Sequence, residues 1–216
     1  LNVYARSSAI PLKHGEKIVL RLIPEKVQVP PLSSLTTDRE LYQILQSVVK
    51  CRQGLFLITG PTGSGKTTTL YSLLHQLNSI ELNVITVEDP VELEIPGINQ
   101  LEINVKQQMT FEKALKAILR QDPDCIMIGE IRDHESAKIA LEAAMTGHLV
   151  LSTLHTPSSL EVIPRLRDLG IEKSLISSGL VGAMTQKLVR KICSHCIEDH
   201  LIDDEEKKLI EKYYDP

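Results

Sequence analysis

The stretch Gly60-Pro61-Thr62-Gly63-Ser64-Gly65-Lys66-Thr67 follows the pattern G-x-x-x-x-G-K-[ST], which is typical of a phosphate-binding loop, or P-loop. The apolar run 55–59 before it predicts a strand, and the run 68–77 after it predicts a helix. Glycines let backbone N–H groups surround phosphate oxygens, and a helix N-terminus carries partial positive charge. The stretch therefore predicts a nucleotide site at a strand–loop–helix junction.

Two side chains of the loop have specific expected tasks. Lys66 is placed to reach the β- and γ-phosphates, and the hydroxyl of Thr67 is placed to bind Mg²⁺. The expected ligands are therefore ATP or ADP together with Mg²⁺. The residues of this stretch that we expect to bind the nucleotide are Gly60, Thr62, Gly63, Ser64, Gly65, Lys66, Thr67 and Thr68.

The composition is that of a globular protein. The chain has 216 residues, of which 42% are hydrophobic and 24% are charged, so one large domain or one domain with additional pieces is expected. No apolar run approaches the roughly 18 residues of a membrane span. The first residues lack the apolar core of a signal peptide, and we expect a cytosolic protein.

The charge of the chain is unevenly distributed. The net charge is −4, and eight acids against three lysines give residues 198–216 a charge of −5, which leaves +1 for the rest. A nearly neutral body lacks the basic surface of a nucleic-acid-binding protein. The chain has no Trp and two Phe, so aromatic side chains for base stacking are also scarce. No direct contact with nucleic acid is expected.

The middle of the chain repeats a strand-then-helix pattern. Apolar runs at 83–87, 125–128 and 149–153 predict strands, with helices between them. This alternation predicts an α/β fold with a mostly parallel sheet that is flanked by helices. Before the P-loop strand, Thr37 and Glu40 have the spacing of a capping box and predict the start of another helix.

Two stretches carry separate structural expectations. Residues 93–105 alternate in polarity around a Pro-Gly pair, which predicts a small two-stranded ribbon. Residues 172–190 are expected to be helical with a basic end. They follow a helical segment that Pro164 is expected to divide and Gly170 to end.

Acidic residues follow two of the expected strands, where a parallel sheet binds its ligands. Glu130 comes shortly after 125–128, downstream of the P-loop, which is the Walker B arrangement. Such an acid holds Mg²⁺ through water or takes a proton from the attacking water. Glu88 directly follows 83–87, although its acidic segment taken alone is more typical of a solvated loop.

Five stretches, taken together, resemble the ATPases of type II secretion and type IV pilus assembly. The resemblance extends over nearly all of residues 1–196, and the joint pattern is far more specific than any one piece. The stretches are G-P-T-G-S-G-K-T-T-T-L-Y (60–71), T-V-E-D-P-V-E (86–92), L-R-Q-D-P-D (119–124), I-G-E-I-R-D (128–133) and T-G-H-L-V-L-S-T-L-H-T (146–156).

The resemblance implies a motor ATPase of RecA-like fold that works as a hexameric ring, with nucleotide at the subunit boundaries. It implies inner-membrane platform and cytoplasmic adaptor proteins as partners, and a cytoplasmic location at the bacterial inner membrane. The implied domains are the end of a second, PAS-like N-terminal domain (1–23), a linker (24–36), a RecA-like ATPase domain (37–190) and a C-terminal segment with half of a cysteine metal motif (191–216).

The resemblance also implies roles for single residues. Glu130 is the implied Walker B glutamate, and Glu88 is implied to polarise water or assist Mg²⁺. His148 and His155 are implied to sense the γ-phosphate. With Lys66, these four form the expected catalytic set.

Two arginines near the start of the chain are implied to contact the nucleotide phosphates. They are Arg6 and Arg21, and composition alone would describe both as surface charges. Because a linker separates them from the P-loop, a neighbouring subunit of the ring is the expected source of these arginines.

Cys193 and Cys196 form a C-x-x-C pair, which retraction ATPases of the family normally lack. Assembly and secretion members carry two such pairs, which together suit a tetrahedral Zn²⁺ site. This sequence has no second pair, so a site would need another ligand such as His200. Two thiolates alone bind Zn²⁺ poorly, and an occupied zinc site is not expected in this chain.

Other functions of the same motifs stay open at this point. RecA-like proteins include nucleic-acid-translocating ATPases, and the resembled family includes pilus-retraction motors. A nucleotide-binding scaffold without turnover also contains a P-loop. The nearly neutral body argues against the first, the cysteine pair against the second, and the presence of both Lys66 and Glu130 against the third.

Overall fold

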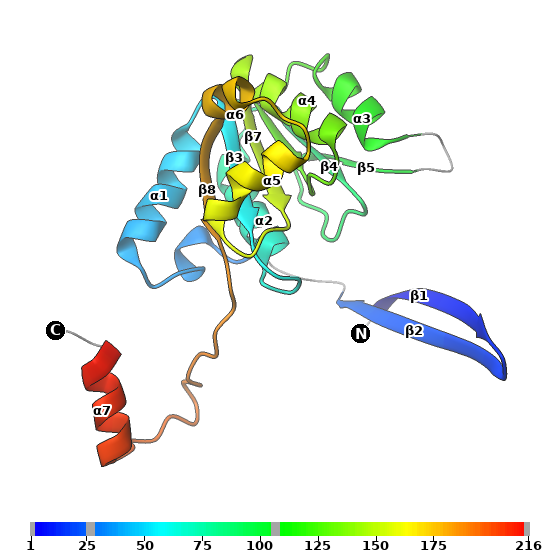
Figure 1. Ribbon diagram of the computed structural model, residues 1–216. Helices are drawn as coiled ribbons and strands as arrows, with labels where there is room; N and C mark the ends of the chain where they lie inside the picture. The colour runs from blue at the N-terminus through cyan, green and yellow to red at the C-terminus, as the bar shows by residue number, and fades with distance from the viewer. Residues whose placement is uncertain (1–2, 25–28, 105–108, 214–216) are drawn as a thin grey trace.

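A six-stranded sheet forms the body of the molecule, and all of its described strand pairs are parallel (Figure 1). The structure is a computed structural model that describes residues 3–24, 29–104 and 109–213. The strand order is β5-β4-β6-β7-β3-β8. The strands are β3 (Gly54–Thr59), β4 (Val84–Glu88), β5 (Asn99–Glu102), β6 (Cys125–Ile128), β7 (Leu149–Leu154) and β8 (Leu180–Thr185). The predicted α/β class with a mostly parallel sheet is confirmed.

Helices cover both faces of this sheet, and each face has its own apolar cluster. Successive residues of a strand point to opposite faces. Leu55 and Leu57 of β3 therefore belong to one cluster, and Phe56 and Ile58 to the other. The first cluster packs under α3 (Phe111–Ile118), α4 (His134–Met145), α5 (Val162–Asp168) and α6 (Lys173–Gly179). The second packs under α1 (Arg39–Lys50), α2 (Lys66–Leu77) and the short 3-10 helix η1 (Leu32–Ser34).

The start of α1 differs from the capping box that the sequence predicts. Asp38 is the N-cap, and its carboxylate accepts hydrogen bonds from the backbone N–H groups of Glu40 and Leu41. Thr36 accepts a hydrogen bond from the N–H of Asp38. A carboxylate is a stronger acceptor than a hydroxyl, which explains why the cap moves from Thr37 to the next residue.

The two-stranded ribbon predicted for residues 93–105 does not form. Asn99–Glu102 instead adds to the main sheet as β5, in parallel to β4, and Leu93 to Ile95 lie in a loop. The backbone N–H of Ile95 donates to the side chain of Gln100 at 2.6 Å. The alternating pattern marked a half-buried strand correctly, but it does not say which strand will be the partner. The end of the predicted ribbon, Val105, lies outside the described residues.

The helix predicted for residues 172–190 ends after one short segment. Its second half is β8, which pairs in parallel with β3, and residues 186–190 have no regular structure. Two glycines permit close packing here, since a Cβ on Gly182 would lie 3.0 Å from the Phe56 ring and one on Gly179 2.9 Å from Leu141. Pro164 does not divide the preceding helix either, because it lies in the first turn of α5. A proline is tolerated there because the first turn has unbonded N–H groups.

Two further pieces stand apart from the body in Figure 1. The strands β1 (Val3–Leu12) and β2 (Gly15–Pro24) pair only with each other, as an antiparallel hairpin. The apolar run 18–23 lies in β2. At the other end, α7 (Asp204–Tyr213) is exposed along its length. The remaining short element, the 3-10 helix η3 (Ser159–Glu161), directly precedes α5.

The stretch predicted as a linker is partly built into the body. Leu32 in η1 is 4% exposed and packs in the second cluster, and Ser72 of α2 donates to the carbonyl of Pro30. Residues 25–28 of the predicted linker lie outside the described residues. The domain boundaries stay predictions.

Candidate nucleotide site

The P-loop joins the carboxyl end of β3 to the start of α2, as the sequence predicts. Gly60, Gly63 and Gly65 all have positive φ values, of 136°, 78° and 85°. A Cβ on Gly63 would meet none of the described atoms within 4 Å, whereas one on Gly60 would lie 2.2 Å from the carbonyl oxygen of Gln186. The loop is therefore packed on one side and open on the other, as a phosphate cradle must be.

The polar atoms of the loop fit an anion. Ser64 Oγ is buried and has no hydrogen-bond partner among the described residues. Lys66 is 9% exposed, and its Nζ donates to the carbonyls of Gly60 and Pro61 at 2.9 and 3.0 Å. Burial lowers the pKa of Lys66, and the nearby Glu130 opposes that shift. An orphaned hydroxyl and a desolvated cation at a helix N-terminus are what a bound phosphate would satisfy.

Thr67 opens onto a small cavity of about 80 Å³ beside the loop. Thr68 lies one residue further along α2 and is exposed, as is Thr62 in the loop itself. The cavity brings the P-loop helix together with both acids that the sequence selected. Its lining is Thr67, Leu70, Glu88, Asp89, Pro90, Glu92, Phe111, Met127, Gly129 and Glu130.

Glu130 follows β6 and lies in a cluster of charges. Arg132 donates to Oε1 of Glu130, and His155 Nε2 lies 3.4 Å from Oε2. The hydrogen bond from Arg132 is the main reason that the pKa of Glu130 lies below its usual value, and burial opposes the shift. Arg132 also lies 3.7 Å from Asp89. The arrangement keeps Glu130 ionised, as both metal binding and proton acceptance require.

Asp133, next along the chain, has a separate structural task. Its carboxylate accepts from the backbone N–H and the hydroxyl of Ser136, and so caps α4. Arg132 lowers the pKa of Asp133 less than the hydrogen bonds from Ser136 do. It forms its ion pairs with Glu130 and Asp89.

Glu88 is the last residue of β4, and it is 2% exposed. Tyr71 of α2 donates to Oε2, while Oε1 accepts from Thr86 at 2.6 Å and from Gln100 at 3.1 Å. Burial, and next the contact with Glu88, raise the pKa of Tyr71 well above its usual range. The solvated loop that Glu88 alone would suggest is wrong, because this carboxylate is buried and ligated by neutral donors.

The two histidines lie at opposite ends of strand β7. His155 follows the carboxyl end of β7, beside Glu130. His148 precedes β7, where its Nδ1 lies 2.9 Å from the carbonyl of Ala143 and its carbonyl accepts from Gly54. The six residues of β7 separate these two ends by about 20 Å. His148 therefore lies away from the P-loop of its own chain, and its role as a γ-phosphate sensor stays a prediction.

Arg6 and Arg21 lie opposite each other in the register of the β1–β2 hairpin. This register brings the two backbone positions together. Figure 1 shows that this hairpin lies away from the P-loop of the same chain. The role of both arginines as phosphate contacts stays a prediction.

The C-terminal cysteines do not form a metal site among the described residues. Cys193 and Cys196 are exposed free thiols, and hydrogen bonds from the backbone of His195 and from Cys196 lower the pKa of Cys193. His200, the third ligand weighed above, pairs with Glu206 at 3.0 Å. Across residues 3–24, 29–104 and 109–213, no three metal-ligating side chains lie together. The donors present do not fit Zn²⁺.

Gln186 is a site residue that the sequence did not reveal. Its backbone N–H donates to Thr59 at 2.9 Å, and its side chain bonds to the carbonyl of Ser64 at 2.8 Å and the hydroxyl of Thr69 at 2.7 Å. One side chain thus joins the end of β3, the P-loop and the first turn of α2. Its place after a strand was hidden, because the stretch was expected to be helical.

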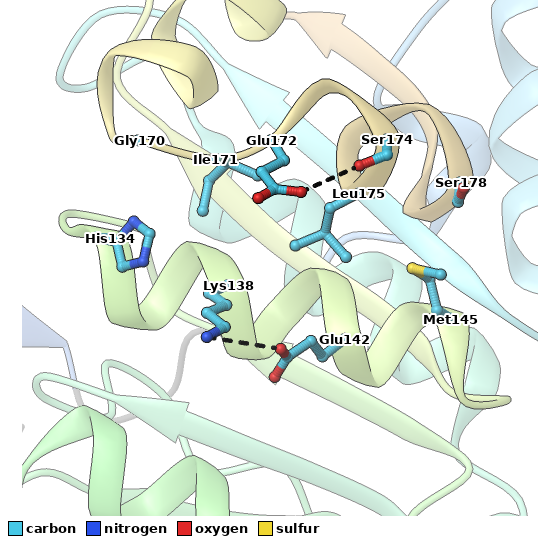
Figure 2. A pocket seen from close by; sticks show the side chains of 10 residues that line it. All are labelled: His134, Lys138, Glu142, Met145, Gly170, Ile171, Glu172, Ser174, Leu175 and Ser178. Carbon is cyan, nitrogen blue, oxygen red and sulfur yellow. Dashed lines mark hydrogen bonds and ion pairs between the residues drawn. The ribbon is translucent and has the colours of Figure 1, made fainter.

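A larger hollow of about 450 Å³ lies between α4 and α6 and has no P-loop residue in its lining (Figure 2). Its polar side chains pair with close neighbours, since Lys138 lies 4.0 Å from Glu142 and Ser174 bonds to Glu172 at 3.4 Å. His134 at one end is held by the carbonyl of Leu169 at 2.8 Å. Size therefore does not identify the functional site here, because the groups that fit a phosphate gather at the smaller cavity.

A P-loop after β3, an acid after β6 two positions away in the sheet, and parallel strands throughout define a P-loop NTPase of the RecA-like class. The family model described as "Type II/IV secretion system protein" matches residues 1–214. The chain belongs to this family, and the resemblance noted from the five stretches is confirmed.

Curated relatives carry names from secretion and from pilus assembly. The chain is 49% identical over 209 residues to the "Type II secretion system ATPase E" of Vibrio cholerae, a match that covers 97% of this chain and 42% of that protein. It is 48% identical over 196 residues to the "Type IV pilus assembly ATPase PilB" of Thermus thermophilus, which covers 91% of this chain and 22% of that protein. The chain thus spans less than half the length of either relative.

A solved structure supports the same fold. The crystal structure of the pilus retraction motor PilT with bound ADP matches with a TM-score of 0.75 and 34% identity. The match covers 88% of this chain and 57% of that one.

Proposed function

We propose that this chain is the ATP-hydrolysing part of a motor that drives type II secretion or type IV pilus assembly. The observation that carries the proposal is that Lys66, Thr67 and Glu130 lie close together at the carboxyl ends of the strands, with Glu88 beside them. A P-loop alone does not determine which reaction a protein catalyses. Here an ionised acid, Glu130, lines the same cavity as Thr67 of the P-loop helix, and this combination can hydrolyse ATP.

In the proposed reaction, water attacks the γ-phosphorus of ATP. The new P–O bond forms as the bond to the bridging oxygen breaks, which leaves ADP and inorganic phosphate. Glu130 accepts the proton of the attacking water, and Lys66 with the loop N–H groups holds the phosphate charge. Thr67 and Glu130 would hold Mg²⁺, which when bound neutralises charge on the phosphate oxygens.

The assembly around this chain also belongs to the proposal. We place it in a hexameric ring at the cytoplasmic side of the inner membrane, with a membrane platform and a cytoplasmic adaptor as partners. In such a ring, the hairpin arginines Arg6 and Arg21 of one subunit would reach the P-loop of the next. None of the helices in the described parts of the chain is both long and apolar enough to cross a membrane. In the proposal, the partner proteins provide the attachment to the membrane.

Likeness to PilT supports a pilus-retraction motor as the second candidate. Relatives at 48–49% identity carry secretion or assembly names, and the chain has the Cys193–Cys196 pair, so we favour assembly. A nucleic-acid-translocating ATPase would show turnover that DNA or RNA stimulates, with steep salt dependence.

Phosphate release from ATP tests the proposal directly. We expect Lys66→Ala and Glu130→Gln each to lower turnover at least about 100-fold, the usual loss for an electrostatic or general-base group. Lys116→Ala serves as the matched control, because Lys116 pairs with Glu112 on the exposed face of α3. Wild-type turnover in the Glu130 variant would contradict the assignment.

A further inference from the structure

The carboxylate of Glu88 is buried beside the proposed reaction site and is held by neutral hydrogen-bond donors. Glu88 lines the cavity together with Thr67 and Glu130, yet it is 2% exposed and its carboxylate accepts from three neutral donors. A carboxylate offers about four acceptor sites, two on each oxygen. Thr86 and Gln100 occupy Oε1, and Tyr71 occupies one site on Oε2. The remaining acceptor site is therefore on Oε2, the oxygen that Tyr71 holds.

The hydrogen-bond direction at Tyr71 is fixed by its second partner. The backbone N–H of Glu92 donates to the Tyr71 hydroxyl oxygen at 3.2 Å. The single hydroxyl proton is then free to point at Glu88. Because burial and Glu88 raise the pKa of Tyr71, the hydroxyl keeps this proton and acts as a permanent donor rather than as an acid.

Tyr71 also connects three parts of the site. It lies four residues after Thr67 on α2, so the two side chains share one helix face. Through Glu92 it reaches the loop after β4, and through Glu88 it reaches the end of that strand. A shift of the P-loop helix would thus be transmitted to the acid by one hydroxyl group.

We propose that Tyr71 is a positioning residue for the reaction, and that its hydroxyl fixes the orientation of Glu88 so that Oε2 faces water in the cavity beside Thr67. This inference rests on the proposed ATPase function. Tyr71 does not touch the nucleotide in this scheme and acts only through Glu88. The competing view is that Tyr71 simply fills space beneath the site.

Tyr71→Phe distinguishes the two views, because it removes the hydroxyl and keeps the ring. We expect turnover of ATP to fall about 10- to 100-fold, the range for one hydrogen bond to a charged group. The affinity for ATP, measured by titration with a fluorescent analogue, should stay within about twofold, since no phosphate contact is lost. The matched control is Tyr42→Phe on α1, whose hydroxyl accepts from Gln46 at 2.8 Å away from the site; it should change neither quantity.

The combination with Glu88→Gln completes the test. If Tyr71 acts through Glu88, the double variant Tyr71→Phe/Glu88→Gln has the same turnover as Glu88→Gln alone. This comparison holds even where Tyr71→Phe alone fails to fold, because the double variant leaves no buried charge without its donor. Unchanged turnover in Tyr71→Phe, or a further loss in the double variant, overturns the inference. Absence of turnover in the wild-type protein overturns the proposed function as well.

Discussion

At the scale of single residues, the ion pairs of Arg132 could not be predicted from the sequence motif. The sequence marks Glu130 through its place after an apolar strand, but nothing in the pattern says which cation will neutralise it. The structure supplies Arg132, which lies two residues on and reaches back to Glu130 while also approaching Asp89. The identity of an acid is thus local information, whereas its ionisation depends on how the following loop folds.

We predict from this contact a pH dependence of turnover. Arg132 lowers the pKa of Glu130, so the ionised, active form persists to lower pH. In Arg132→Gln the burial of Glu130 is no longer opposed by its main partner, and the pKa of Glu130 rises. The acidic limb of the turnover–pH profile should therefore move to higher pH than in wild type.

Turnover measured across the acidic and neutral range checks this shift, and Arg120→Gln at the exposed turn after α3 is the control. Superimposable profiles for wild type and Arg132→Gln would show that Glu130 does not set the acidic limb.

Single elements were predictable where their signals were local. The P-loop helix and the strands that precede both acids follow from short patterns, and the structure confirms them. The failures at 93–105 and 172–190 have a common cause. Both stretches add a strand to the edge of an existing sheet, and that choice depends on a partner far away in the sequence.

The cap of α4 carries a stability prediction. Asp133→Ala removes the acceptor for the N–H of Ser136 and should lower the free energy of unfolding by about 1 kcal/mol at neutral pH. Because this hydrogen bond lowers the pKa of Asp133, its contribution is fully present above about pH 3.9 and is lost as the pH falls below that value. The difference from wild type should shrink accordingly.

Urea unfolding at neutral and acidic pH measures this effect. Asp168→Ala is the matched control, because Asp168 ends α5, where an acid gains nothing from the helix dipole. Equal losses in the two variants would mean that the cap contributes no more than any surface acid.

At the scale of the whole molecule, the two apolar clusters define which residues the body needs. The clusters and their partly buried neighbours extend from Val29 to Met184. The hairpin β1–β2 and helix α7 contribute no described residue to either. The resemblance implied a domain at 37–190, but it did not foresee that η1 packs into the body or that residues 180–185 form a strand, because each depends on contacts made across the finished sheet.

We therefore predict that residues 29–190 fold alone, with a thermal midpoint within a few degrees of the full chain. A shorter chain that stops at residue 179 lacks β8 and should lose cooperative unfolding, since β3 then becomes an edge strand that is paired only with β7. Circular dichroism during heating compares the two. Failure of the 29–190 chain to fold would show that the hairpin or the C-terminal segment is part of the core.

The pairing of β3 with β8 sets an order of events during synthesis. The hydroxyls of Thr59 and Thr185 lie 3.0 Å apart although 126 positions separate them, and Gln186 follows directly to hold the P-loop. A ribosome adding residues at its usual pace needs on the order of ten seconds to cover that interval. During this time the growing chain carries its phosphate loop without the strand and side chain that hold it in place. ATP or ADP should therefore protect the finished protein but not the chain that is still being made.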